Sequence, residues 1–335
     1  MIAAFEAKTA NDVWLQAYKS LQNSDSLTSS RLGPTRELLH VNFSISDPRQ
    51  RWTLSRFPAL NPAFAIVETL WILAGDNTAA LLNYWNPLLP QFSGNSECYH
   101  GAYGYRLRRQ FGFDQLEQAY NALRSNPYSR QVILQIWDPR IDFPTATGEA
   151  VDADIPCNIC ALPKVRDGKL EWLQIMRSND LYLGTPYNFI QFTTLQEVLS
   201  GWIGIELGAY HQISDSLHIY EKDFQVVQAD KKIEPLTNTD NLALSKNAFE
   251  AQMKEIMPCV KKLSSPTLQK HEFSRMVQNI NLHKSYKNLF LIVAADAARR
   301  RGWEQEMHDA IDRCSNALLC VAFSRWEKRH PLNKI

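Results

Sequence analysis

Two stretches, Asp154-Ile155-Pro156-Cys157-Asn158 and Met176-Arg177-Ser178-Asn179-Asp180-Leu181-Tyr182-Leu183-Gly184-Thr185-Pro186-Tyr187-Asn188, carry most of the information in this chain. The first places a cysteine directly after a proline. The second places an arginine, an acid, a glycine-proline turn and an amide at fixed offsets. Together they supply a soft nucleophile, a cation for an anionic ligand and a carboxamide able to read the edge of a heterocycle. The combination indicates covalent chemistry on a phosphorylated, amide-like ring.

Length and composition set the outer limits. The chain has 335 residues, of which 45% are hydrophobic, so it can bury one large domain, alone or with a smaller addition. Its net charge of +1 and scattered Lys and Arg give no sign of a nucleic-acid partner. No run of eighteen apolar residues and no signal layout at the N-terminus is present, so we expect a soluble, cytoplasmic protein without membrane contact. We expect the basic cluster Arg299-Arg300-Arg301 on a solvated helix face.

The six cysteines are too few and too widely spread for a disulfide framework, so free thiols are expected. Cys157 and Cys160 have the spacing of a redox or zinc pair. Because no second pair and no nearby histidine accompanies them, we expect no metal.

Hydrophobic periodicity predicts an α+β domain over residues 1–238 and a helical C-terminal region over 239–335 packed on it. The expected helices cover residues 10–22, 63–74, 114–124 and 189–202, the second opened by Asn61-Pro62. The expected strands cover residues 38–45, 131–137, 158–165, 170–177 and 207–220, with a polar loop at 23–35 and a hairpin turn at 166–168. In the helical region, a break is expected at 264–266.

Cys157 and Glu68 are the candidate reacting groups. Cys157 follows Pro156 at the start of an expected strand, where its thiol could point into a cleft; the alternative is a buried structural cysteine. Glu68 is the one charged residue in the run 63–73. It should either face solvent or be buried with a raised pKa suited to proton transfer.

Three arginines are candidates for clamping a phosphate: Arg31, Arg130 and Arg177, the last followed by Ser178. For each of them a surface ion pair is the alternative. Each lies beside small or turn-forming residues, which leaves room for an anion.

Asn188 offers a donor and an acceptor, as reading the edge of a uracil-type base requires, but it could instead cap the helix that begins at 189. His218 and Tyr220 alternate on one strand face, where they could bind a sugar hydroxyl or simply pack.

The chain resembles thymidylate synthase and the related pyrimidine-nucleotide hydroxymethylases. The Pro156-Cys157 block and the block from Arg177 to Asn188 carry the resemblance, which runs in order from about Arg31 to Tyr220, over half of the chain. It implies the layered α+β fold of that family, with a curved mixed sheet that forms a homodimer interface.

The resemblance also implies a reaction. Cys157 would attack C6 of the pyrimidine, which makes C5 nucleophilic toward the methylene group of 5,10-methylenetetrahydrofolate. Glu68 would organise water and move protons at the ring and the folate, and Tyr103 would contribute to the proton-transfer step. No metal takes part.

Binding roles follow from the same resemblance. Arg31, Arg177 and Ser178 would hold the 5′-phosphate, and Arg130 would reach the phosphate of the partner across a dimer interface. The remaining positions divide between nucleotide and folate: Asn188 would orient the base, His218 and Tyr220 would contact the ribose, Asp180 would bind the pterin, and Trp85 and Gly184 would line the folate pocket.

The chain departs from the family pattern at four places. The usual adjacent arginines are Arg130-Gln131, Asn158 replaces the histidine usual after the nucleophile, and Asp215 stands one residue too far from His218. The tail after residue 220 is long and does not match the segment that closes over the site and excludes water in synthases.

Water exclusion decides between a methyl and a hydroxymethyl product. The foreign C-terminal region therefore favours 5-hydroxymethylation, with reductive methylation of dUMP to dTMP as the alternative. Asn188 suits uracil, since relatives that act on cytosine commonly carry aspartate there, and the kind of sugar stays open. Two lesser alternatives are a nucleotide-binding protein without catalysis and a thiol hydrolase that uses Cys157 with His218.

Overall fold

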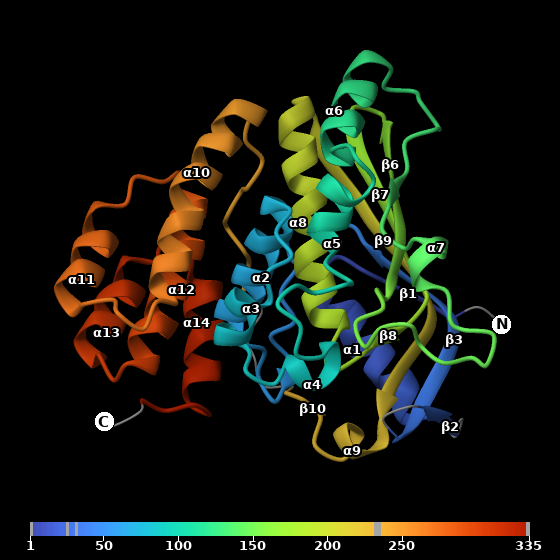
Figure 1. The fold of residues 1–335 in the computed structure, drawn as a ribbon, viewed down its shortest axis with the longest axis horizontal. Helices are drawn as coiled ribbons and strands as arrows, with labels where there is room; N and C mark the ends of the chain where they lie inside the picture. The colour runs from blue at the N-terminus through green and yellow to red at the C-terminus, as the bar shows by residue number, and fades with distance from the viewer. Residues whose placement is uncertain (1–2, 25–26, 31–32, 231–235, 333–335) are drawn as a thin grey trace.

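A mixed sheet of eight strands forms one layer of the computed structural model, which describes residues 3–24, 27–30, 33–230 and 236–332 (Figure 1). The main path runs in the order β1-β3-β9-β7-β6-β5, with β2 paired to β3 and β8 to β9. The strands are β1 (Ala4–Ala7), β2 (Leu27–Ser30), β3 (Gly33–Ile45), β5 (Leu134–Gln135), β6 (Asn158–Arg166), β7 (Lys169–Met176), β8 (Asn179–Asp180) and β9 (Glu206–Tyr220). A separate two-stranded ladder joins β4 (Arg56–Phe57) to β10 (Gln228–Ala229).

The sheet combines parallel and antiparallel pairs, which confirms the expected α+β class. The central strand β9 pairs antiparallel with β3 and parallel with β7 and β8. A tight hairpin joins β6 to β7 as predicted, because Asp167 and Gly168 both take positive φ angles, 49° and 72°.

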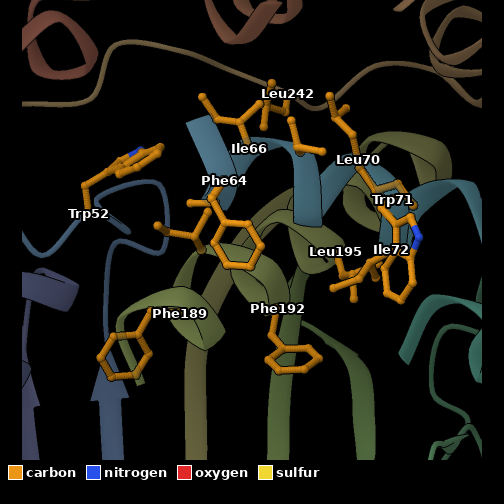
Figure 2. Close-up of a cluster of buried hydrophobic side chains, with 14 of the residues drawn as sticks. Trp52, Phe64, Ile66, Leu70, Trp71, Ile72, Phe189, Phe192, Leu195 and Leu242 are labelled. Carbon is orange, nitrogen blue, oxygen red and sulfur yellow. The ribbon is translucent and has the colours of Figure 1, made fainter. Parts of the chain in front are cut away.

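Two long helices form the next layers. The apolar α8 (Thr185–Ile203) lies against the sheet beside α1 (Ala10–Gln22), and α2 (Pro62–Ala74) packs on α8. Figure 2 shows Phe189, Phe192 and Leu195 of α8 beneath the α2 side chains. The shorter helices are α3 (Ala79–Trp85), α4 (Pro90–Ser93), α5 (Tyr103–Tyr105), a π-helix (Arg106–Gln110), α6 (Gln115–Ser125), α7 (Pro139–Asp142) and α9 (Glu221–Phe224).

The C-terminal helices pack on α2 from the side away from the sheet (Figure 1). They are α10 (Lys246–Leu263), α11 (Lys270–Asn279), α12 (Lys284–Arg300), α13 (Glu304–Arg313) and α14 (Ala317–Glu327). The boundary expected at 238 falls in residues 236–245, which have no regular secondary structure. The division into two domains at this point stays a prediction.

Buried polar contacts attach this segment to the rest of the molecule. The carboxylate of Glu197 in α8 accepts hydrogen bonds from Arg49 Nε at 2.8 Å, from Arg51 and from the Leu242 amide at 3.1 Å. Asp240 accepts from Asn288 Nδ2 and Asn316 Nδ2, both at 2.7 Å. The connection between β10 and α10 is therefore held by charge and amide groups as well as by apolar packing.

Two expected boundaries in the sheet were wrong. The loop predicted for 23–35 contains β2 and the start of β3, which pair with each other in a hairpin. Of the strand predicted for 131–137, only Leu134 and Gln135 join the ladder. The amides of Ile136 and Trp137 both donate to the Ile159 carbonyl, so regular pairing ends there although inward and outward residues still alternate.

The solvated face expected for Arg299-Arg300-Arg301 was also wrong. Arg299 is 6% exposed and pairs with Asp296. Arg300 donates to the carbonyls of Tyr84 and Trp85, each at 2.8 Å, and Arg301 donates to those of Leu263 and Ser265. These carbonyls lie at or just beyond the C-terminal ends of α3 and α10, where no further helical turn can satisfy them, so the arginines serve the packing of helices.

Candidate active site

Cys157 stands immediately before β6 and is bridged to Arg177, the residue after β7. The Arg177 amide donates to the Cys157 carbonyl at 2.9 Å, and its guanidinium donates to the carbonyls of Pro156 and Ile155 at 2.9 and 3.0 Å. Burial raises the pKa of the Cys157 thiol, while Arg177 opposes that shift. A thiol with a raised pKa needs a base close by before it can act as a nucleophile.

Glu68 is half-buried and turned from α2 toward α8. Gln191 Nε2 of α8 donates to Glu68 Oε2 at 2.6 Å. Burial raises the pKa of Glu68 to about 7, with the Gln191 hydrogen bond lowering it and Asp154 raising it further. A carboxyl group with this pKa can both donate and accept a proton near neutral pH.

Tyr103 lies close to both Cys157 and Glu68, and all three side chains are half-buried. Burial raises the pKa of its hydroxyl, and Cys157, Asp154 and Glu68 lie close enough to add to the shift, which the Asn158 side chain partly counters. Cys157 before β6, Glu68 in α2 and Tyr103 in α5 are therefore brought together.

Asp154 and Gln191 are functional candidates that the sequence reasoning did not assign. Asp154 Oδ2 accepts from the Gly101 amide at 2.7 Å, and burial raises the pKa of Asp154 to about 6. Its place three residues before Cys157 was a usable signal. Gln191 stands one helical turn after Asn188 in α8, on the surface that faces Glu68.

Asn188 lies inside α8, so its expected alternative role as a helix N-cap was wrong: the helix starts at Thr185 and Gly184 occupies the cap position. The buried Asn188 amide donates to Asn179 Oδ1 at 2.9 Å and to Met176 Sδ at 3.7 Å. Since Met176 lies opposite Asn158 in the β6–β7 ladder, Asn188 stands beside the Cys157 segment.

His218 and Tyr220 share one face of β9, and their rings meet edge to face with centroids 5.5 Å apart. Asp215, three residues before His218, projects from the opposite face of the strand. Its carboxylate pairs with His40 Nδ1 at 2.7 Å. The one-residue difference in spacing thus removes this acid from the histidine.

Asp180 is the last residue of β8, and its side chain caps the turn that follows. Its Oδ1 accepts from the amides of Tyr182 and Leu183 at 2.7 and 2.8 Å, whereas its buried Oδ2 has no partner among the described residues. Burial raises the pKa of Asp180 and the neighbouring His218 opposes the shift. Gly184 lies so near that an added Cβ would stand 3.2 Å from Asn179 Oδ1 and 3.3 Å from the Asp180 carbonyl oxygen.

The other expected site residues are placed less closely together. Ser178 is half-buried next to Arg177, and Arg130 is exposed in the loop before β5, with no ion pair or hydrogen bond to the described part of the chain. Arg31 lies outside the described residues. The Trp85 side chain is fully buried at the end of α3, where Arg300 of α12 donates to its carbonyl, and its place in the folate pocket stays a prediction.

Two further properties concern the described ranges alone. Within them, no three His, Cys, Asp or Glu side chains gather closely enough to share a metal ion. None of the helices there is both long and apolar enough to cross a bilayer.

Comparison with known proteins adds two findings. The family model described as thymidylate synthase matches residues 34–260. Among individual relatives, a deoxyuridylate hydroxymethyltransferase of Bacillus phage SP01 is 35% identical over 200 residues, which cover 56% of this chain and 51% of the relative. The chain therefore spans about half the length of that relative.

Two other relatives are similar over comparable lengths of this chain. A deoxyuridylate hydroxymethyltransferase of Pseudomonas phage M6 is 34% identical over 184 residues, covering 54% of this chain and 51% of the relative. A protein of Methanosarcina barkeri named "Putative thymidylate synthase" is 30% identical over 225 residues, covering 66% of this chain and 91% of the relative. The family model covers the candidate site residues from Glu68 to Tyr220 and leaves α11 to α14 outside.

Proposed function

The chain belongs to the thymidylate synthase family, and from that premise we propose that it transfers a one-carbon unit from 5,10-methylenetetrahydrofolate to C5 of a pyrimidine nucleoside 5′-monophosphate. The observation that carries the proposal is the proximity of Cys157, Glu68 and Tyr103 in one half-buried cluster. A protein that only binds nucleotides needs neither a nucleophile nor an acid with a pKa near 7.

Cys157, Glu68 and Tyr103 have different proposed roles in the reaction. Cys157 adds through sulfur to C6 of the ring, which places electron density at C5. Glu68 and Tyr103 hold and move the protons that this addition and its reversal require. The pKa of Glu68 near 7 allows it to act in both directions at neutral pH.

Asp180 and Gly184 are the proposed contacts for the cosubstrate. 5,10-Methylenetetrahydrofolate supplies the one-carbon unit, and its pterin ring carries N–H donors. The buried, unpartnered Oδ2 of Asp180 is an acceptor of the right charge and place for such donors. Gly184, one turn away, leaves space where a side chain would crowd Asn179 and Asp180.

Nucleotide binding draws on the same segment. Arg177 donates from Nε and one terminal nitrogen to carbonyls of the Cys157 segment, which holds the guanidinium in place. We propose that it binds the 5′-phosphate together with Ser178, the next residue in the chain. Asn188 faces the base, and His218 and Tyr220 are the candidates for the ribose. Arg31 is proposed as a further phosphate ligand from the sequence resemblance.

A homodimer would complete the site. The face of the sheet away from α8 carries half-buried or exposed apolar side chains at Leu173, Ile175 and Ile213, which a second copy could cover. Arg130 is exposed at the neighbouring edge with its charge unpaired within the described residues. We propose that it reaches the phosphate held by the second copy.

The proposed product is the 5-hydroxymethyl nucleotide, with uracil as the base. Both phage relatives are named for hydroxymethyl transfer to deoxyuridylate. In addition, Ile66, Leu70 and Leu73 of α2 face the C-terminal helices, whereas Glu68 faces α8. The described C-terminal helices thus pack on the side of α2 away from the Glu68–Gln191 contact, and we propose that water can reach the one-carbon intermediate. Reductive methylation remains the alternative named by the family itself.

Product analysis by mass spectrometry tests the proposal. The purified protein would be incubated with methylenetetrahydrofolate and, separately, dUMP, UMP, dCMP and CMP. We expect a hydroxymethylated uracil nucleotide with release of tetrahydrofolate. A methylated product with dihydrofolate would instead assign reductive methylation, and the absence of any modified nucleotide would overturn one-carbon transfer.

A further inference from the structure

We propose that Asn179 is a positioning residue: it holds the Asn188 amide with its carbonyl oxygen toward the base, and thereby favours uracil over cytosine. The inference rests on the proposed function, because it concerns the base of the bound nucleotide. Asn179 itself is 2% exposed and lies behind Asn188, in β8.

The hydrogen bonds of the Asn188 amide nitrogen carry the proposal. Nδ2 has two hydrogens and two acceptors, Asn179 Oδ1 at 2.9 Å and Met176 Sδ at 3.7 Å. Both acceptors belong to buried side chains, Met176 at 0% and Asn179 at 2% exposed. With both hydrogens directed inward, Oδ1 is the atom left for a ligand, and no residue of the described chain donates to it.

The surroundings oppose reversal of this amide. A thioether sulfur accepts hydrogen bonds but cannot donate one, so a reversed Asn188 would set its oxygen against Met176 Sδ. Asn179 is anchored in turn, because its Nδ2 donates to Ser214 Oγ at 3.1 Å. Gln212 Nε2 donates to the same oxygen at 3.1 Å, so the network continues into the buried centre of β9.

The fixed direction has a consequence for the base. Uracil carries an N–H donor at N3, whereas cytosine carries a lone pair there. An Asn188 that presents only oxygen accepts from the uracil N3–H, but it places two lone pairs opposite each other when cytosine binds. An amide free to rotate would adapt to either base, so the discrimination depends on Asn179 and Met176 as well as on Asn188.

The test compares dissociation constants for dUMP and dCMP by titration calorimetry at one pH and salt concentration. For the wild-type protein we expect dUMP to bind about tenfold or more tightly than dCMP, as one mismatched buried hydrogen bond implies. Asn179→Ala removes the acceptor, so the ratio should fall to about threefold or less, mainly through tighter binding of dCMP.

Asn179→Asp is the matched control. A carboxylate can only accept from Asn188 Nδ2, so this variant should keep the wild-type preference even if both affinities change. Met176→Leu, which nearly conserves volume and removes the sulfur acceptor, carries the test if Asn179→Ala does not fold, and its ratio should fall as well.

The outcomes separate the two claims. An unchanged ratio in Asn179→Ala and Met176→Leu, or a wild-type preference for dCMP, would overturn the positioning role while leaving a nucleotide site intact. Failure of the wild-type protein to bind either nucleotide would overturn the proposed function itself.

Discussion

Glu68 and Glu197 are glutamates on the packed helices α2 and α8, the first half-buried and the second fully buried, and their surroundings are opposite in kind. Glu197 is fully buried and meets two guanidinium groups, those of Arg49 and Arg51, together with the Leu242 amide. Glu68 meets one neutral amide, that of Gln191, and no cation pairs with it in the described part of the chain. One carboxylate is neutralised, and the other is left with most of the cost of its burial.

This difference separates a group that holds the fold from a group that can react. Paired charges with satisfied hydrogen bonds attach the segment 236–245 to α8. A buried carboxyl group without a cation shifts its pKa upward, which costs stability but yields an acid that exchanges protons near pH 7. A carboxyl group without a cation partner, close to a thiol nucleophile, is therefore the feature that indicates a reactive site in this chain.

The largest expected effect sets Cys157 against its neighbour Cys160. Cys157→Ser should lower kcat by at least about 10⁴-fold, because a hydroxyl is a far weaker nucleophile than a thiol, while nucleotide affinity changes little. Cys160→Ser, three residues along β6, is the control and should retain turnover. Steady-state kinetics and calorimetry check both variants, and substantial turnover by Cys157→Ser would rule out the covalent mechanism.

The next effect concerns stability and has opposite signs at the two glutamates. Glu197→Gln leaves the charge of the buried Arg51 uncompensated, so the free energy of unfolding should fall by about 3–5 kcal/mol. Glu68→Gln should instead raise it above pH 7, by roughly 1–3 kcal/mol. Urea unfolding at pH 5 and pH 8 measures both.

The sign for Glu68 follows from its pKa. Because the folded value, about 7, exceeds the ordinary value of 4.5, the stability contributed by the neutral form is complete below about pH 4.5 and is lost as the pH rises through 7. The gain from Glu68→Gln should therefore appear at pH 8 and largely vanish at pH 5. Equal gains at both pH values would contradict an unpaired acid.

A smaller effect is expected at the base. Asn188→Asp should shift preference from uracil toward cytosine nucleotides by about tenfold, since a protonated carboxyl group can donate to cytosine N3 while its carbonyl oxygen accepts from the amino group. Competition between dUMP and dCMP measures the shift. If the preference does not change, Asn188 does not read the base.

The smallest expected effect moves the pH profile in two directions. The charge of Asp154 raises the pKa of Glu68 and the Gln191 hydrogen bond lowers it. Asp154→Asn should therefore shift the Glu68 limb of the kcat/KM profile to lower pH and Gln191→Leu to higher pH, each on the order of 0.5–1 pH unit. Shifts in the same direction would show that the limb belongs to another group.

Periodic segments of this chain could be predicted from the sequence, and irregular contacts could not. The first helix matches the expected residues 10–22, and β9 is found one residue earlier than its expected start, because their apolar faces repeat over many residues. The contacts of Arg299, Arg300 and Arg301 depend on where α3 and α10 end in space, which no local pattern encodes.

The candidate site divides along the same line. Cys157, Arg177 and Asn188 stand in a dense motif and could be assigned from it. Gln191 and Asn179 act through amide contacts with residues on other elements, so they emerge only once α2, α8 and β8 are packed together. Trp85 is a different case, since its place in the folate pocket follows only from the family resemblance and its side chain is fully buried at the end of α3.

Release of tritium from C5-labelled dUMP tests the central claim most directly, because the label leaves only when C5 is activated and substituted. We expect wild-type protein to release tritium into water when methylenetetrahydrofolate is present, and Cys157→Ser to release essentially none. Full retention of label by the wild-type protein with dUMP, or release that survives loss of the thiol, would contradict the proposal that Cys157 initiates one-carbon transfer to this ring.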